Sequence, residues 1–171
     1  MFYFKHVLNL PYSDTAKTIK GKEKESLFKK QTSRNKIVKD KHEPKFVKKY
    51  GIYLDDGELS TKLDCIMIDE NNKAAFPLQL KNTKTPKSVY KTQRLQLMLE
   101  SFLIEKVLKY KSPYGYIRYA LSNELIKLDL RDKGELFDII TRIKELIKSE
   151  ILPPSTKYKK RIVDNCYRRF Y

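Results

Sequence analysis

Three polar residues, Asp64, Gln79 and Lys81, interrupt segments that are otherwise apolar. Asp64 lies within KLDCIMI, and Gln79 and Lys81 lie within FPLQLKN, which begins twelve residues further on. Alternate side chains of a strand point to the same face, so Gln79 and Lys81 should point one way while Leu78 and Leu80 point the other. An acid in an apolar strand is costly unless it is paired, hydrogen-bonded or bound to a cation. Oxygen atoms that hold a divalent cation beside an ammonium group suit the attack of water on a phosphodiester.

The elements expected to carry these residues are strands, because apolar residues alternate with polar ones from Tyr50 onward. The pattern predicts three successive, mostly antiparallel strands within residues 51–56, 58–69 and 74–80. Asp-Gly at 56–57 and Asn-Asn at 71–72 are turn signals between them. We therefore expect Asp64 to lie inside the second strand, on the hairpin partner of the strand that carries Lys81.

Helical periodicity replaces this alternation after the third strand. Leucine, methionine and phenylalanine recur at helical spacing within residues 85–110, which predicts a long helix. Two further strands are expected at 115–121 and 124–130, on either side of a turn. An amphipathic helix is predicted over 134–152, before the pair of prolines that follows it.

The chain before residue 50 is rich in basic residues and in strong helix formers. It predicts a helix over 13–39 and a second, basic helical stretch over 44–49. The whole chain, 1–171, is expected to form a single α/β domain, a small mixed sheet flanked by helices. Its helical N-terminal part would span about 13–49, its core about 50–150, and its basic tail 153–171.

The net charge indicates a partner that is a polyanion. The chain has 37 Lys and Arg against 21 Asp and Glu, a formal net charge of +16 and a pI near 9.7. A membrane is the rival explanation, but no apolar run approaches the roughly 20 residues that span a bilayer, and no signal peptide is visible. Two cysteines are too few for a secreted disulfide scaffold. These features predict a soluble protein of the cytoplasm.

Two basic clusters are the expected DNA contacts. The first surrounds the predicted start of the helix over 85–110, where a helix N-terminus suits phosphate and Tyr90 could stack on an unpaired base. Its members are Lys84, Lys87, Tyr90, Lys91 and Arg94, and the second cluster is the tail with Arg168 and Arg169. For any one of these residues, the alternative is that it only keeps a basic protein soluble.

These motifs, taken in order, resemble a known family. The run from GELSTKLDCIMID through FPLQLKN and YKTQRLQLMLESFLIEK to YGYIRYAL is similar to RecB-like nucleases of the PD-(D/E)xK superfamily, and most of all to the CRISPR-associated Cas-four family. The resemblance covers residues 13–121 and reappears in the tail. It implies a restriction-endonuclease-like core, a metal-dependent hydrolase of DNA, and an archaeal or viral source.

The resemblance also implies roles for single residues. Mg or Mn would be bound by Asp64, Gln79, the carbonyl of Leu80 and Glu25, with Lys81 beside the attacking water. A glutamine of the following helix, Gln96, would help to position substrate or water.

Three positions depart from the pattern of that family. The family has a glutamate where Gln79 stands, a histidine where Glu25 stands, and usually a tyrosine where Glu100 stands. An amide is a weaker ligand than a carboxylate for a hard cation, but Glu25 would restore the charge that is missing at Gln79. The alternative is that Asp64 and Lys81 form a structural ion pair and that Glu25 is an ordinary surface charge.

The tail departs further, because the family binds an iron-sulfur cluster through four cysteines. Only Cys65 and Cys166 are present, so a four-cysteine cluster within one chain is excluded by number, and none is expected.

The leading hypothesis is thus a metal-dependent DNA nuclease, an exonuclease or a single-strand endonuclease. It would trim DNA ends for CRISPR spacer acquisition or for viral or mobile-element recombination. The alternative is a catalytically impaired homologue that binds DNA or CRISPR adaptation proteins. A basic scaffold or transcription factor is a third, weaker alternative, because the sequence has no helix-turn-helix or zinc pattern.

Overall fold

The described residues belong to two compact units. The computed structural model describes residues 46–150 together with Ile19 and Tyr158. One unit runs to Phe137 and the other takes up the chain again at Asp138, so each is described by itself. Of the helix predicted over 13–39 only Ile19, which is helical, is described, and the basic tail lies outside the described residues except for Tyr158. The single domain stays a prediction.

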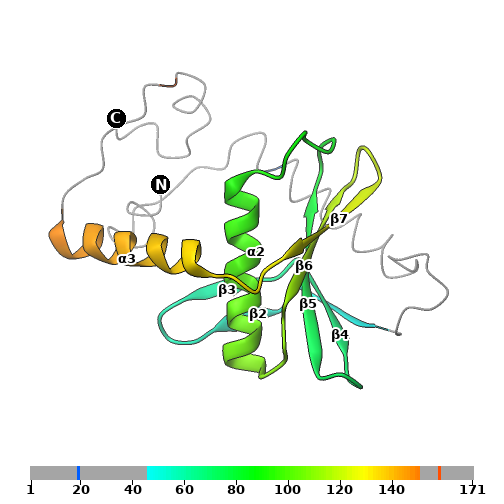
Figure 1. Ribbon diagram of the computed structural model, residues 1–171, viewed down its shortest axis with the longest axis horizontal. Helices are drawn as coiled ribbons and strands as arrows, with labels where there is room; N and C mark the ends of the chain where they lie inside the picture. The colour runs from blue at the N-terminus through cyan, green and yellow to red at the C-terminus, as the bar shows by residue number, and fades with distance from the viewer. Residues whose placement is uncertain (1–18, 20–45, 151–157, 159–171) are drawn as a thin grey trace. The chain divides into compact units, whose positions relative to one another are not determined.

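A five-stranded mixed sheet forms the centre of the first unit (Figure 1). Its strands lie in the order β1, β4, β5, β6, β7. Every neighbouring pair is antiparallel except β5 and β6, which are parallel. A parallel pair needs a crossover, and helix α2 provides it between these two strands. Their bounds are Val47–Tyr50 for β1, Cys65–Asp69 for β4, Ala74–Lys81 for β5, Tyr114–Tyr119 for β6, Glu124–Asp129 for β7 and Lys91–Leu103 for α2. The chain is therefore mixed α/β, as predicted.

The segment expected to be one strand over 58–69 is two strands in two sheets. Strand β3 (Ser60–Lys62) pairs with β2 (Tyr53–Asp55) in a separate hairpin, and β4 begins only at Cys65. The chain bends at Asp64, between the two strands. Our expectation that Asp64 lies inside a strand is wrong, because the alternation of side chains continues through the bend and hides it.

The basic helical stretch predicted over 44–49 is wrong for its described residues. Strand β1 occupies Val47–Tyr50 and pairs antiparallel with β4, with Val47 opposite Ile68 and Tyr50 opposite Cys65. Its side chains alternate between exposed and half-buried. Lysines are well suited to such an edge strand because they discourage further strand pairing. The sheet thus begins before residue 50.

Helix α2 begins six residues later than predicted. Residues 85–90 are not helical. Thr85 instead bonds through its N–H and hydroxyl to the Ser122 hydroxyl in the turn between β6 and β7, at 3.1 and 2.6 Å. At its other end α2 passes into a π-helical segment, η2 (Ile104–Leu108), that stops at Lys109 with φ +61°. This late start leaves the loop after β5 fixed to the β6–β7 turn.

Helix α2 covers one face of the sheet (Figure 1). The larger apolar cluster lies between that face and the helix. Ile66, Ile68 and Ala75 from the sheet pack there with Leu103 and Ile104. Antiparallel register places Ile68 opposite Ala75 and Ile66 opposite Pro77. Two residues further along, the same alternation directs Asp64 and Gln79 to the α2 face. A second cluster, around Cys65, Met67 and Leu78, lies on the opposite face.

The last described helix is α3 (Gly134–Ser149), predicted over 134–152. Its first turn belongs to the sheet unit, where Phe137 meets Phe102 of α2 edge to face. None of the helices in the described residues combines the length and the apolar character needed to cross a bilayer.

Candidate functional site

Asp64 caps the C-terminal end of strand β5. Pairing between β4 and β5 ends at Cys65 opposite Leu78, because the chain bends at Asp64. The rest of β5 therefore has no backbone partner from β4. The Asp64 carboxylate takes that place and accepts the N–H of Leu80 at 3.0 Å. The half-buried carboxylate of Asp64 is thus held at the point where β5 continues beyond its pairing with β4.

The carbonyl of Leu80 lies on the same side of β5 as Asp64. In an extended strand, the N–H and C=O of one residue point to the same neighbouring strand. The next carbonyl, that of Lys81, points the opposite way and accepts the N–H of Ala120 at 2.9 Å. The predicted backbone ligand, Leu80, thus directs its oxygen toward the side where β4 has ended.

Gln79 and Lys81 share one face of β5, as their spacing predicted, and both contact residues of α2. The Gln79 amide donates through Nε2 to Glu100 Oε1 at 3.3 Å. The Lys81 ammonium donates to Gln96 Oε1 at 3.2 Å, and Gln96 Nε2 donates in turn to Glu100 Oε1 at 3.0 Å. These contacts join the end of β5 to one face of α2 through a continuous polar network.

Glu100 is the residue that the sequence interpretation missed as part of the site. Its side chain is 0% exposed, as is that of Gln79. In the sequence, Glu100 stands out only as a departure from the family pattern. A signal was present, because Glu100 follows Gln96 by one helical turn and falls between the buried Leu97 and Leu103 on the apolar stripe. An acid in such a stripe needs a partner, as Asp64 does in its own segment.

Burial and charge act on Glu100 in a defined direction. The pKa of its carboxyl is raised to about 8, first by burial and then by the nearby charge of Asp64. Hydrogen bonds from Gln96 and Gln79, and the charge of Lys81, lower the pKa and offset part of that effect. The two acids therefore lie close enough for the charge of Asp64 to disfavour the ionised form of Glu100.

Two buried oxygen atoms of this network accept no hydrogen bond. They are Gln79 Oε1 and Glu100 Oε2. Buried polar atoms are nearly always paired, so each such exception calls for an explanation. Carboxylate, amide and carbonyl oxygens are the ligands that Mg²⁺ and Mn²⁺ prefer, and here they lie beside Asp64. The residues present therefore fit a hard divalent cation. Among residues 46–150, no cluster of three His, Cys, Asp or Glu side chains is found.

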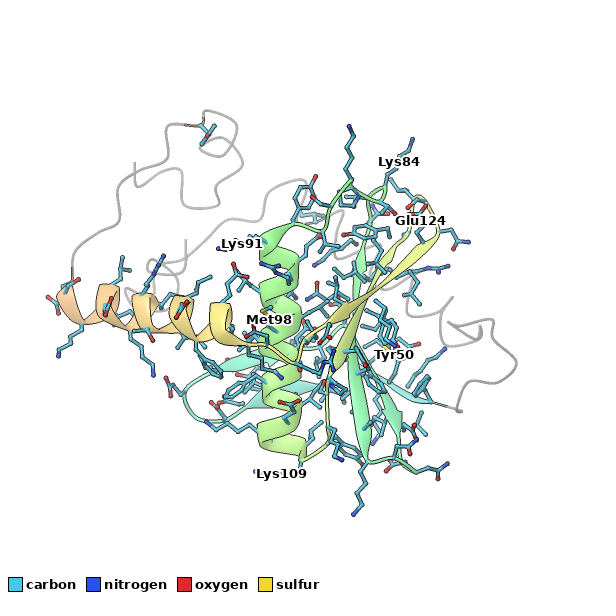
Figure 2. The ribbon with its side chains drawn as sticks, viewed as in Figure 1. Tyr50, Lys84, Lys91, Met98, Lys109 and Glu124 are labelled. Atoms are coloured by element: carbon cyan, nitrogen blue, oxygen red, sulfur yellow. The ribbon has the colours of Figure 1, made fainter. Side chains whose placement is uncertain are left out.

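The first predicted DNA cluster lies at the same end of β5. Lys84 and Lys87 are exposed in the loop before α2, not in its first turns as expected, because α2 starts at Lys91. Figure 2 shows Lys84 in that loop and Lys91 at the start of the helix. Tyr90 precedes the helix, is 61% exposed, and forms no side-chain cap on it.

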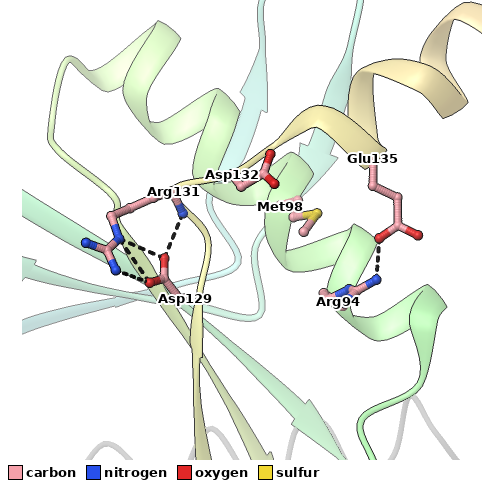
Figure 3. A pocket seen from close by; sticks show the side chains of 6 residues that line it. All are labelled: Arg94, Met98, Asp129, Arg131, Asp132 and Glu135. Atoms are coloured by element: carbon pink, nitrogen blue, oxygen red, sulfur yellow. Dashed lines mark hydrogen bonds and ion pairs between the residues drawn. The ribbon is translucent and has the colours of Figure 1, made fainter.

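Lys91 and Arg94 are already engaged by an acid. Both form ion pairs with Glu135 of α3, Lys91 at a distance of 2.7 Å. Arg94 also lines a pocket (Figure 3), in which Asp129 pairs with Arg131 as Arg94 does with Glu135. Its charges largely neutralise one another, and it uses other residues of α2 than the network around Glu100. The pocket lining consists of Arg94, Met98, Asp129, Arg131, Asp132 and Glu135.

Three predicted site residues lie outside the part of the chain that the structure describes, namely Glu25 and the tail residues Arg168 and Arg169, and so does Cys166. Cys65, which the structure does describe, is a buried free cysteine.

No protein-family model matches the sequence, and no curated protein resembles it significantly.

Proposed function

We propose that the protein is a metal-dependent DNA nuclease with a restriction-endonuclease-like, PD-(D/E)xK core, as the resemblance to the Cas-four family implies. The supporting observation is that Asp64, Gln79 and Lys81 lie together at the end of β5. Gln96 of α2 joins them through its contact with Lys81. Oxygen ligands beside an ammonium are the elements that phosphodiester hydrolysis requires.

The chain would hold the cation through oxygen atoms. Asp64, Gln79 Oε1 and the Leu80 carbonyl are the proposed ligands, and Glu25 stays a predicted one. A bound Mg²⁺ or Mn²⁺ would supply Lewis-acid polarisation of the phosphate and activation of water. Asp64 is suited to this role because the Leu80 N–H fixes one of its carboxylate oxygens at 3.0 Å.

Lys81 would act on the charge that develops at the phosphate. Its ammonium is held in place by Gln96 Oε1 at 3.2 Å, so it need not be reorganised when substrate arrives. A positioned cation stabilises a developing negative charge far better than a mobile one. Gln96 is thus a positioning residue for Lys81.

DNA would approach along the loop between β5 and α2. Lys84 and Lys87 are exposed in that loop and could contact phosphate groups. The exposed ring of Tyr90 could stack on an unpaired base. Lys91 and Arg94 would have to give up their ion pairs with Glu135 to bind phosphate, so we expect them to contribute less to DNA binding. Binding through such contacts should fall steeply as salt increases.

The biological setting follows from the resemblance alone. DNA ends would be trimmed for CRISPR spacer acquisition, together with CRISPR adaptation proteins, or for viral or mobile-element recombination. The trimming of DNA ends would take place in the cytoplasm of the cell or of the infected host.

The test is cleavage of end-labelled single-stranded and duplex DNA with Mg²⁺ or Mn²⁺. Lys81→Met and Asp64→Asn should each lower the rate by roughly 100-fold or more, because each removes charge from the transition state. Lys62→Met, at an exposed position of β3, serves as the control and should cut within about twofold of wild type. Equal cutting by the wild type and Lys81→Met would identify a contaminant and refute the proposal.

A second candidate function is a catalytically impaired homologue that binds DNA or an adaptation protein. Gln79 favours it, because this amide stands where a charged ligand would bind a cation more tightly and is instead bonded to Glu100. This candidate predicts DNA binding that is the same with Mn²⁺ and with EDTA, and no cleavage by the wild type. A Gln79→Glu variant that gains cleavage would then mark the loss of an ancestral site.

A further inference from the structure

Glu100 has a free oxygen inside the site. Oε1 accepts two hydrogen bonds, from the amides of Gln79 and Gln96, and is thereby fixed against both β5 and its own helix. Oε2 accepts none, although the side chain is 0% exposed. One half of the carboxylate is held in place while the other half is left for a further partner.

The neighbours of that free oxygen do not explain why an acid is needed here. Gln79 and Gln96 are neutral, and a neutral residue could accept their hydrogen bonds equally well. Burying a carboxylate is expensive unless a positive charge accompanies it. Lys81 is the nearby ammonium, but it donates its hydrogen bond to Gln96 Oε1 rather than to Glu100. The acid is therefore explained better by a cation that reaches it in the functional state.

The unpaired oxygen of Gln79 is a second, independent observation. Gln79 is also 0% exposed, and its Oε1 accepts no hydrogen bond although its Nε2 binds Glu100. Gln79 and Glu100 thus contact each other through Nε2 and Oε1, and each has one further oxygen that accepts no hydrogen bond. Two such oxygens beside the Asp64 carboxylate form a ligand set for a hard divalent cation.

We propose that Glu100 is the second carboxylate ligand of the metal site, binding through Oε2 while Gln79 and Gln96 hold Oε1. The inference rests on the proposed function for the identity of the cation, Mg²⁺ or Mn²⁺. It makes the described residues sufficient to supply two negative charges, from Asp64 and Glu100. It also gives Gln79 two tasks, since its oxygen faces the metal and its nitrogen orients Glu100.

The competing explanation is a permanently protonated Glu100 with a purely structural role. In that case Oε2 carries a proton and could donate it to Gln79 Oε1, which would pair both unused atoms. Glutamine has nearly the shape of a protonated glutamate and also donates at that position. A structural role thus predicts that Glu100→Gln changes little, whereas a ligand role predicts that it weakens metal binding.

The experiment measures Mn²⁺ affinity of the full chain at pH 7.5, from the electron paramagnetic resonance signal of free Mn²⁺. We expect Glu100→Gln to raise the Kd about tenfold or more, because a charged ligand is lost. Asp64→Asn should do the same. Glu124→Gln, an exposed acid of β7, is the matched control and should stay within twofold of wild type. The melting temperature of each variant in EDTA is measured first, to verify that it folds.

The outcomes separate this inference from the proposed function. A Glu100→Gln variant that binds Mn²⁺ within twofold of wild type overturns the inference, whether or not the wild type cleaves DNA. Metal binding that depends on Glu100, in a protein that cleaves no DNA, supports the inference and refutes the nuclease. If Glu100→Gln does not fold, Glu100→Asp replaces it, since it keeps the charge but withdraws the oxygens, and the same twofold limit applies.

Discussion

The stability of the metal-free protein should depend on pH through Glu100. Burial raises the pKa of this carboxyl from 4.5 to about 8 in the folded state. In the unfolded chain the group returns to its ordinary value. Between these two pH values the native state therefore keeps a proton that the unfolded state has released. The contribution of Glu100 is fully present below about pH 4.5 and is lost as the pH rises through about 8.

The size of the effect follows from the shift. A difference of about 3.5 pKa units, at about 1.36 kcal/mol per unit, sets an upper limit of about 5 kcal/mol. Relaxation of the site and entry of water reduce such values, so we expect a loss of about 2 to 5 kcal/mol between pH 5 and pH 8.5. That is a large part of the total stability of a typical domain, about 5 to 15 kcal/mol.

The assay is urea unfolding in EDTA at several pH values from 5 to 8.5, with wild type and Glu100→Gln in parallel. Glutamine cannot ionise, so the variant should lack this loss and become the more stable protein at the alkaline end. Titrations shared by both proteins cancel in the difference between the curves. The acids Asp56 and Asp129, whose pKa values hydrogen bonds and charge lower to about 2, titrate below this window. If the free energy of unfolding changed with pH in the same way for the wild type and Glu100→Gln, the reasoning would be refuted.

Three further predictions concern the sheet unit around the site. Gly115→Ala should destabilise the protein by about 1 to 3 kcal/mol in urea unfolding, because its Cβ would lie 2.7 Å from a methyl group of Leu130; an unchanged midpoint would contradict this. Asp56→Ala should cost about 1 to 3 kcal/mol, since its carboxylate accepts two backbone N–H groups and pairs with a lysine of η2; cleavage activity at 25 °C should not change. Cys65 should resist Ellman's reagent in a Cys166→Ser background until the protein unfolds, because burial raises the pKa of its thiol to about 12; rapid labelling of native protein would argue against the buried position.

The prediction of the fold from the sequence succeeded where a pattern is local. Strands β6 and β7, their turn, and helix α3 lie close to their predicted positions. Patterns that depend on pairing were less informative. The lysine-rich segment of β1 has the composition of a helix, but its pairing with β4 makes it a strand. The late start of α2 depends on a contact between Thr85 and Ser122, which no local pattern reveals.

The sequence alone determined that Gln79 and Lys81 share one face, because the alternation of a strand fixes this wherever the strand lies. It also singled out Asp64 as an acid that needs a partner. The tertiary structure alone decided that Asp64 lies at a bend where it caps β5, and that Glu100 joins the site from α2. The reason is physical, since both facts depend on contacts between residues 16 and 21 positions apart, from Leu80 to Asp64 and from Gln79 to Glu100. Strand register and helix packing set those contacts, and neither is encoded in the spacing of one segment.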